Sequence, residues 1–241
     1  MLLLAINPNT SESVTERLRE HVAAEVGADV TLQMATAPFG ARYIADETSF
    51  AVAGHAALAA YASHCEVHGE PDAVLLGCFG DPGVWALREV AQRPVVGLAE
   101  AAMVEAARYG RFAIVTGGAA WGPMLRRLAR SLDLNGALID VHIVEPTGAQ
   151  LAADPAMALQ VLGAACRRAA AGAHAVVLGG AGLAGMAAVL APSLDVPLID
   201  SVSAGARAVM SGNARFLATT RPAATAQDWS GVSPTLPRWR T

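Results

Sequence analysis

The sequence predicts an α/β protein made of two similar halves, each built around a parallel sheet. Short apolar runs alternate with segments of helical periodicity over most of the 241 residues. Alternation of this kind favours parallel strands joined by helical crossovers. The chain also repeats itself, because DAVLLGCFGDPG at 72–83 resembles HAVVLGGAGLAG at 174–185. We therefore expect a duplicated α/β unit whose second copy starts near residue 98.

The apolar runs give the expected strands in chain order. Strands are expected at 2–6, 30–34, 73–77, 95–97, 112–116, 138–143, 175–178 and 198–199. Helical patterns cover 49–62, 121–132 and 155–171, and a first helix is indicated by the stripe of Val14, Leu18 and Val22. Strands and helices therefore alternate in both halves, as parallel sheets require.

Residue types also predict helix starts and domain limits. Ser13 and Glu16 fit a capping box for the first helix. Asp81 followed by Pro82 favours a cap and a first helical residue over a catalytic carboxylate. We expect a first domain at 1–97, completed by roughly 203–241, and a second domain at 98–202. The proline-rich stretch 219–241 lacks helical periodicity and is expected to extend over the body or a neighbouring subunit.

Composition excludes several classes of function. Charged residues make up 16% of the chain and the net charge is −4, so no basic surface for nucleic acid is expected. The sequence contains no lysine, which excludes a lysine Schiff base and a P-loop lysine. The first apolar run, about five residues, is too short for a signal peptide or a membrane span. With three cysteines and no disulfide pattern, we expect a soluble cytoplasmic protein.

The carboxyl ends of four expected strands carry polar or glycine-rich segments. These segments are 7–10, 77–79, 116–118 and 179–181. Ligands of open α/β sheets bind beyond the carboxyl ends of the strands. If the two halves face each other, the four segments meet in one cleft.

Cys78 stands between an expected strand and an expected helix start, and glycines lie close on both sides. Backbone N–H groups and the positive end of the helix predict a lowered thiol pKa and a reactive thiolate. The alternative is a small apolar side chain that fills a tight turn. Cys65 and Cys166 fall within helical patterns and are expected to be structural.

Asn7, Asn9 and Thr10 offer more polar groups than one helix cap requires. The surplus favours side chains that face a ligand, although capping alone is an alternative. His64 and His68 could share the face of an exposed helix end, but the further ligands of a metal site are missing, so no metal is expected.

A dinucleotide fingerprint is a weak alternative. Gly180, Gly182 and Gly185 match the spacing G-x-G-x-x-G after an expected strand. Too few residues follow Asp200, however, to supply the remaining strands of that fold. We therefore expect no nucleotide cofactor at this position.

These segments resemble the aspartate/glutamate/hydantoin racemase superfamily, above all its hydantoin-racemase-like branch. INPNTSESVTERL at 6–18 is similar to the opening strand and helix of that branch, and LLGCFGDPGVWALREVAQRPVVGLAEAA at 75–102 to its first cysteine segment. AIVTGG, VVLGGAGLAGM and VPLIDSV follow in the expected order. The resemblance covers the chain except its tail. It implies two domains related by a pseudo-twofold axis, an active site in the cleft between them, and a homo-oligomer.

The resemblance also implies cofactor-independent chemistry. Two cysteines of the family face the α-carbon of the substrate from opposite sides, and one removes the proton while the other returns one to the opposite face. Asn7, Asn9 and Thr10 would bind the carbonyl or carboxylate oxygen of the substrate. The other residues expected to bind substrate are Phe79, Gly80, Thr116, Gly117, Gly118 and Ala181.

The chain departs from the family at Gly180, which stands where the second cysteine is expected. The internal repeat gives the same alignment, because Cys78 matches Gly180. We expect Cys78 to transfer a proton at the α-carbon of a small carbonyl compound such as a 5-substituted hydantoin or an amino acid. If nothing replaces the second cysteine, this transfer takes place on one side of the carbon. Another group or a water molecule opposite Cys78 could instead preserve racemisation, or the glycine could be an engineered replacement.

Two further functions stay open at this point. A cofactor-free malonate-type decarboxylase needs only one cysteine, which protonates the intermediate. Relatives of this kind in the superfamily carry that cysteine in the second half of the chain. Because Cys78 lies in the first half, this alternative predicts a product of the opposite configuration. A protein that binds small carboxylates without turnover also needs no second base.

Overall fold

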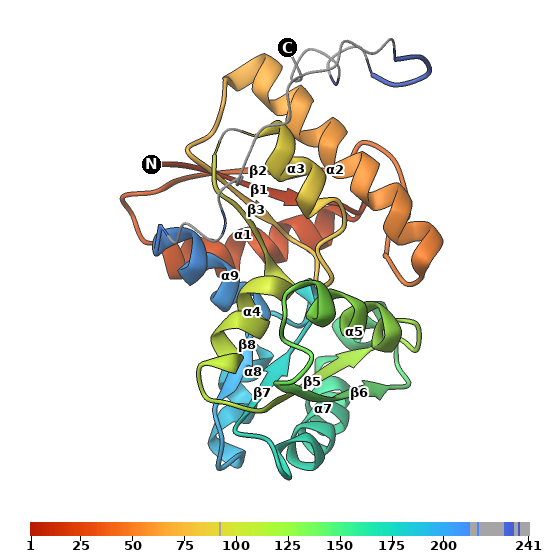
Figure 1. The fold of residues 1–241 in the computed structure, drawn as a ribbon, viewed down its shortest axis with the longest axis vertical. Coiled ribbons are helices and arrows are strands. Elements are labelled where there is room, and N and C mark those ends of the chain that lie inside the picture. The colour runs from red at the N-terminus through yellow and green to blue at the C-terminus, as the bar shows by residue number, and fades with distance from the viewer. Residues whose placement is uncertain (92, 213–215, 217–228, 234–235, 237–241) are drawn as a thin grey trace.

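The chain folds into two lobes, each containing a four-stranded parallel sheet (Figure 1). The computed structural model describes residues 1–91, 93–212, 216, 229–233 and 236. The first sheet has the order β2-β1-β3-β4 and the second has the order β6-β5-β7-β8. The same order in both lobes confirms the duplicated α/β unit that the sequence predicts.

Strands and helices alternate along both lobes. The first sheet contains β1 (Leu2–Asn7), β2 (Thr31–Thr36), β3 (Ala73–Leu76) and β4 (Val95–Gly97). The second contains β5 (Phe112–Gly117), β6 (Leu138–Val144), β7 (Ala175–Leu178) and β8 (Leu198–Asp200). The helices are α1 (Glu12–Val26), α2 (Glu47–His68), α3 (Val84–Val90), α4 (Leu98–Ala107), α5 (Trp121–Ser131), α6 (Gly148–Ala153), α7 (Pro155–Ala170), α8 (Met186–Leu190) and α9 (Ser201–Met210), with the 3₁₀ turns η1 (Ala181–Leu183) and η2 (Ala191–Ser193).

The backbone repeats its hydrogen bonds where the two lobes carry their equivalent loops. The N–H of Gly77 donates to the carbonyl of Ile6 in β1 over 2.8 Å, and the N–H of Gly179 donates to the carbonyl of Val115 in β5 over 2.9 Å. The next residue along the chain is Cys78 in the first lobe and Gly180 in the second. The fold therefore makes Cys78 and Gly180 equivalent, as the sequence repeat predicts.

The predicted capping box at the start of α1 is wrong. The helix begins at Glu12 behind Ser11, and no side chain caps it. The Oγ atom of Ser13 lies 3.0 Å from the Oγ atom of Ser11, so the two hydroxyl groups are bonded to each other. The carbonyl of Ser11 instead accepts a hydrogen bond from the side chain of Asn7, which ties the helix to the end of β1.

The prediction that Asp81 starts the following helix is also wrong. Helix α3 begins at Val84, and Asp81 lies in the preceding turn with a φ of 58°. The turn directs the Asp81 carboxylate toward α4, where it accepts hydrogen bonds from the N–H groups of Ala99 and Glu100 over 2.9 and 2.7 Å. Asp81 therefore caps the helix that leads from the first lobe into the second.

Helices α4 and α9 lie between the lobes (Figure 1). Helix α9 packs against α1 and α4 and also contacts strands of both sheets. The predicted domain limits, including the return of the chain to the first domain near residue 203, stay predictions. Of the predicted extended tail, only 229–233 and 236 lie among the described residues.

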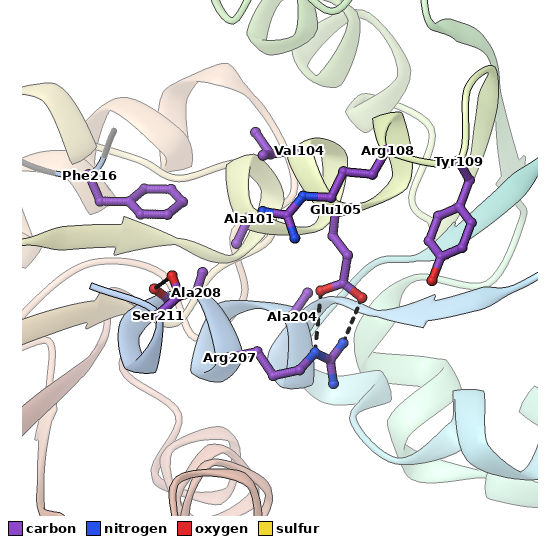
Figure 2. Close-up of a pocket in the computed structure, with 10 residues that line it drawn as sticks. All are labelled: Ala101, Val104, Glu105, Arg108, Tyr109, Ala204, Arg207, Ala208, Ser211 and Phe216. Atoms are coloured by element: carbon purple, nitrogen blue, oxygen red, sulfur yellow. Dashed lines mark hydrogen bonds and ion pairs between the residues drawn. The ribbon is translucent and has the colours of Figure 1, made fainter. Parts of the chain in front are cut away.

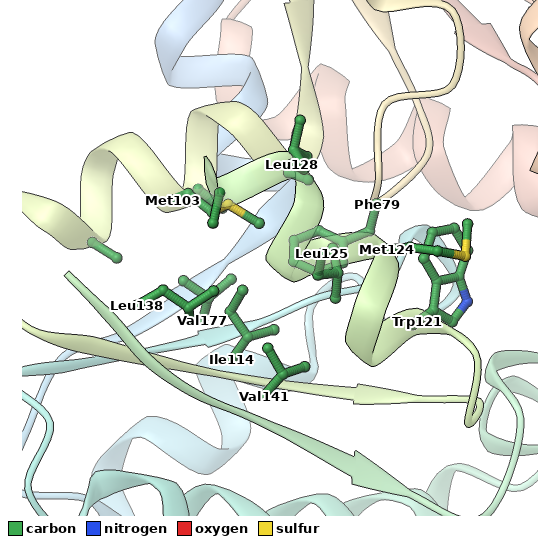
Figure 3. Close-up of a cluster of buried hydrophobic side chains, with 14 of the residues drawn as sticks. Phe79, Met103, Ile114, Trp121, Met124, Leu125, Leu128, Leu138, Val141 and Val177 are labelled. Atoms are coloured by element: carbon green, nitrogen blue, oxygen red, sulfur yellow. The ribbon is translucent and has the colours of Figure 1, made fainter. Parts of the chain in front are cut away.

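One hydrophobic cluster crosses from lobe to lobe. Helix α5 covers a face of the second sheet with Leu125 and Leu128, opposite Ile114 and Val177 (Figure 3). Phe79 comes from the first lobe but packs in this cluster, with 4% of its surface exposed. Burial of such a ring stabilises contact between the lobes by about 1.5–3 kcal/mol.

A helix that crosses a membrane needs a stretch of about 20 mostly apolar residues. Within the described part of the chain, none of the helices is long and apolar enough to do so.

Candidate active site

A narrow cavity lies where the strand ends of the two lobes meet. Its volume is about 80 Å³. All four predicted segments contribute to its lining, which confirms that the strand ends share one cleft. The lining residues are Asn9, Val14, Tyr43, Ile44, Gly77, Cys78, Phe79, Thr116, Trp121, Gly148, Gly180, Ala181 and Gly182.

Cys78 contributes to the wall from the first lobe and Gly180 contributes from the second. The Cys78 residue is 8% exposed. Its carbonyl accepts the N–H of Asp81 over 3.1 Å, which closes a tight turn directly after β3. Both halves of the predicted pair, the thiol and the position without a side chain, therefore face one cavity.

The predicted lowering of the thiol pKa is wrong. Burial, and then the negative charge of Asp81, raise the pKa of Cys78 well above its usual value. The positive end of a helix does not offset them, because α3 begins only at Val84. The resting thiol is therefore neutral near pH 7.

Asp81 is itself fully enclosed. Burial raises the pKa of its carboxyl group to about 7, although the N–H groups of Ala99 and Glu100 and the charge of Arg88 act in the opposite direction. The carboxylate lies against Gly97, where an added Cβ would stand 2.2 Å from the Asp81 Cγ. Glycine at this position leaves the room that the carboxylate needs.

Asn7 does not line the cavity, and its side chain is fully buried. Its amide nitrogen lies 3.0 Å from each of three oxygens, namely Asn9 Oδ1, the Ser11 carbonyl and Thr15 Oγ1. Its Oδ1 accepts the N–H of Asn9 over 3.2 Å. The structure thus gives Asn7 the role of shaping the loop, and of the two asparagines only Asn9 lines the cavity.

Asn9 lines the cavity, and its Oδ1 is held on the loop side by the N–H of Ser11 over 2.9 Å. Thr10 is not part of the lining, and its N–H donates to the carbonyl of Ala41 over 3.1 Å. Thr116 does line the cavity, while its hydroxyl donates to the carbonyl of Gly179 over 2.8 Å. The structure brings together only part of the predicted polar set.

Three predicted glycines lie behind the wall. Gly80 packs against Trp121, where an added Cβ would meet the ring at 2.3 Å. Gly117 packs against the carbonyl of Pro146, at 2.5 Å from an added Cβ. Gly118 likewise faces Trp121 and is absent from the lining. Phe79 and Ala181, by contrast, line the cavity as predicted.

Several lining side chains were not predicted. Tyr43 and Ile44 come from the loop between β2 and α2, and Trp121 comes from the first turn of α5. An aromatic side chain shortly after the glycines at the end of β5 was the available signal for Trp121. Val14 and Gly148 carry no comparable signal in the sequence.

The cavity is uncharged. The described lining contains no Asp, Glu, Lys, Arg or His, and its polar side chains are Asn9, Tyr43, Cys78 and Thr116. A charged group buried without a partner is costly. The lining therefore favours a neutral ligand over a dicarboxylate.

Gly180 lines the same cavity as Cys78 but has no side chain. Its φ is 141°, a value that side chains rarely adopt, and an added Cβ would lie 3.3 Å from atoms of Leu183. Its N–H donates to Ser201 Oγ over 3.3 Å. Gly179 has a different role, because an added Cβ there would stand 2.1 Å from the ring of Phe79.

A larger hollow, about 410 Å³, lies along α4 and α9 (Figure 2). Its wall carries the ion pair of Glu105 with Arg207, whose Nη2 lies 2.8 Å from Glu105 Oε1. None of the strand ends contributes to its lining. We therefore assign the active site to the smaller cavity, which holds Cys78.

Helix α2 ends at His68, which is exposed as predicted, but His64 one turn earlier is buried, so the prediction of an exposed face is wrong for His64. Burial, followed by the neighbouring His68, lowers the pKa of His64. Over the described residues, no three His, Cys, Asp or Glu side chains are grouped so that they could hold a metal ion. Cys65 and Cys166 are buried in α2 and α7, and burial raises their pKa values to about 11 and about 12.

A family model described as Asp/Glu/Hydantoin racemase matches residues 3–209. The chain belongs to this family. Hydantoin racemase from Paenarthrobacter aurescens is 32% identical over 210 residues, which cover 86% of this chain and 89% of that protein. The family resemblance inferred from the cysteine and asparagine segments is thereby confirmed.

Solved structures of family members share the two-lobed fold. Allantoin racemase from Klebsiella pneumoniae aligns with a TM-score of 0.87 at 30% identity over 98% of both chains. Allantoin racemase from Pseudomonas fluorescens aligns with a TM-score of 0.84 at 25% identity, over 91% of this chain and 94% of that one. The predicted two-domain α/β architecture is confirmed.

Proposed function

We propose that the protein is a cofactor-independent, racemase-type enzyme that moves the proton on C5 of a neutral hydantoin-like ring. The observation that carries the proposal is a thiol, Cys78, in an uncharged cleft at the strand ends. Similar proteins are named hydantoin racemase and allantoin racemase. Allantoin is itself a hydantoin with a ureido group on C5, so both names describe one ring chemistry.

Cys78 acts as base and acid in this proposal. As thiolate it takes the proton from C5, and the electron pair of the C–H bond moves into the neighbouring carbonyl to give an enolate. The resulting thiol returns a proton to the same carbon, and the carbonyl forms again. Because the resting thiol is neutral, the fraction in the thiolate form limits the first step.

Asn9 supplies the donor for the enolate oxygen. The N–H of Ser11 holds its Oδ1 on the loop side, which leaves the amide NH₂ group as the part of Asn9 able to donate into the cavity. A donor aimed at the developing charge stabilises the enolate more than the neutral carbonyl. Asn7 fixes this orientation from behind.

Gly180 makes the transfer one-sided. It offers no side chain to protonate the face of C5 away from Cys78. The space beside it instead accepts the C5 substituent, which the aromatic rings of Tyr43, Phe79 and Trp121 can surround. Exchange with solvent on one face, with retention of configuration, is the expected reaction.

The alternatives fit the cavity less well. Amino acids, malonates and other small carboxylates bring one or two carboxylates, and the described lining has no cationic side chain to pair with them. A neutral ring needs only hydrogen-bond donors and apolar walls, which the cavity offers. Assembly as a homo-oligomer stays a prediction, to be measured by light scattering after size-exclusion chromatography.

The test is proton NMR in D₂O on the separate enantiomers of allantoin and of 5-alkyl and 5-benzyl hydantoins, with optical rotation followed in parallel. We expect the C5 proton of one enantiomer to exchange while the rotation is retained, and Cys78→Ser to fall to the rate without enzyme. Exchange by wild type that Cys78→Ser retains in full would overturn the role of the thiol. Decay of rotation at the rate of exchange would overturn the one-sided mechanism.

A further inference from the structure

Helix α1 contacts both walls of the cleft. Near its start, the carbonyl of Ser11 and the hydroxyl of Thr15 bond to the amide of Asn7 and hold the loop that presents Asn9. Beyond this point, Arg17 Nη1 donates to the carbonyl of Gly182 over 2.5 Å. Gly182 belongs to the second lobe and lines the cavity. One helix of the first lobe therefore bonds to the loops on both sides.

The next turn of α1 adds a second contact to the same loop. His21 lies four residues after Arg17, so both side chains project from one face of the helix. The Nδ1 of His21 lies 2.9 Å from the Arg17 carbonyl. Its ring reaches Gly185, where an added Cβ would stand 2.5 Å from His21 Nε2. The loop from Gly182 to Gly185 thus rests on two side chains of the other lobe.

Inside this loop, the N–H of Leu183 donates to the carbonyl of Gly180 over 2.9 Å and closes the turn η1. Gly179, Gly180 and Gly182 have no side chains to pack, and glycine has the greatest backbone freedom. Within the second lobe, the N–H groups of Gly180 and Gly185 are bonded to Ser201 and Asp200. Those bonds fix the ends of the loop but do not relate it to the first lobe, which carries Cys78.

We propose that Arg17 is a positioning residue that fixes the loop at 180–182 opposite Cys78. The inference rests on the proposed function, because it assigns Arg17 a part in that reaction. A hydrogen bond from a charged guanidinium is stronger than one between neutral groups, so it can hold two lobes in one relative placement. A displacement of about 1 Å in such a site can reduce the rate by about 10²-fold.

The test compares Arg17→Met with Arg19→Met. Arg19 lies on the same helix but is exposed and pairs with Glu16 of its own helix, so it is a matched control for loss of an arginine. We expect Arg17→Met to lower kcat for C5 exchange about 10- to 100-fold, with a smaller change in KM. We also expect faster alkylation of Cys78 by iodoacetamide, because the cleft loosens. Arg19→Met should stay within about twofold of wild type, as expected for an exposed pair.

Equal exchange and equal alkylation rates in the two variants would overturn the proposal. If Arg17→Met does not fold, Arg17→Gln decides, because it removes the charge and shortens the side chain that reaches the Gly182 carbonyl. Wild-type rates of exchange and alkylation in that folded variant would count against a positioning role. Failure of the proposed function is seen separately, as wild type without exchange on any hydantoin. The alkylation rates still test the placement of the loop in that case.

Discussion

Replacement of Gly180 by cysteine would give the cleft a second thiol opposite Cys78. The structure sets the cost of this change. A side chain at a φ of 141° is strained, by about 1–3 kcal/mol, and its Cβ would press on Leu183 at 3.3 Å. For a chain of this size, each kcal/mol lowers Tm by roughly 2–4 °C. We expect a folded variant with a measurably lower Tm.

The gain should appear in racemisation. A positioned acid or base contributes about 10²- to 10⁴-fold to proton transfer. We expect Gly180→Cys to lose the optical rotation of a single hydantoin enantiomer at least about 10²-fold faster than Gly180→Ser. The serine variant is the matched control, because it carries the same backbone strain and a hydroxyl that is a poor acid and base at neutral pH.

Polarimetry on one enantiomer at constant pH provides the assay, and the melting temperature of each variant is measured alongside. Equal rates of rotation loss in Gly180→Cys and Gly180→Ser, both folded, would refute the reasoning that position 180 faces the substrate opposite Cys78. Rapid loss of rotation by wild type would refute the premise that its transfer is one-sided.

Three further predictions concern the site and the residues around it. Asp81→Asn removes the charge that helps to raise the pKa of Cys78, so alkylation of Cys78 at pH 8 should become several-fold faster. An unchanged rate would count against this coupling. Asp200→Asn is the control, because Asp200 also caps a helix. In wild type, the raised pKa of Cys78 means that the rates of Cys78 alkylation and of C5 exchange should rise about tenfold per pH unit from pH 7 to 9. A plateau of either rate below pH 8 would contradict a raised pKa. Arg88→Met removes the guanidinium that forms a buried ion pair with Glu100 and should lower the free energy of unfolding in urea by about 3–5 kcal/mol. Arg88→Met combined with Glu100→Leu should largely restore that loss.

The strands and the similarity of the two lobes could be predicted, because apolar runs are local signals and the internal repeat links the lobes. Apolar runs mark most strands, although β2 includes Gln33 and β6 includes Asp140 and His142. The similarity of 72–83 to 174–185 pairs Cys78 with Gly180 from the sequence alone. The register of β1 with β3 and of β5 with β7 follows the same repeat. Three helices, α4, α6 and α9, had no predicted counterpart.

The remaining features depend on contacts between distant segments. The sequence predicts a local cap at Asp81 because its partners, Ala99 and Glu100, lie 18 and 19 residues further along the chain. The wrong direction for the Cys78 pKa has the same origin, since it assumed a helix that starts at Asp81 rather than at Val84. Arg17 could not be predicted either, because its acceptor is 165 residues away in the other lobe.

Phe79 adjoins Cys78 in the chain, yet its ring is seated on Gly179 across the cleft. Any movement that parts the lobes must withdraw this ring into water, at a cost of about 1.5–3 kcal/mol. Taken alone, this contribution favours the closed arrangement of the lobes by about 10- to 100-fold. We therefore expect Phe79→Ala, which leaves no ring on Gly179, to make the lobes easier to separate.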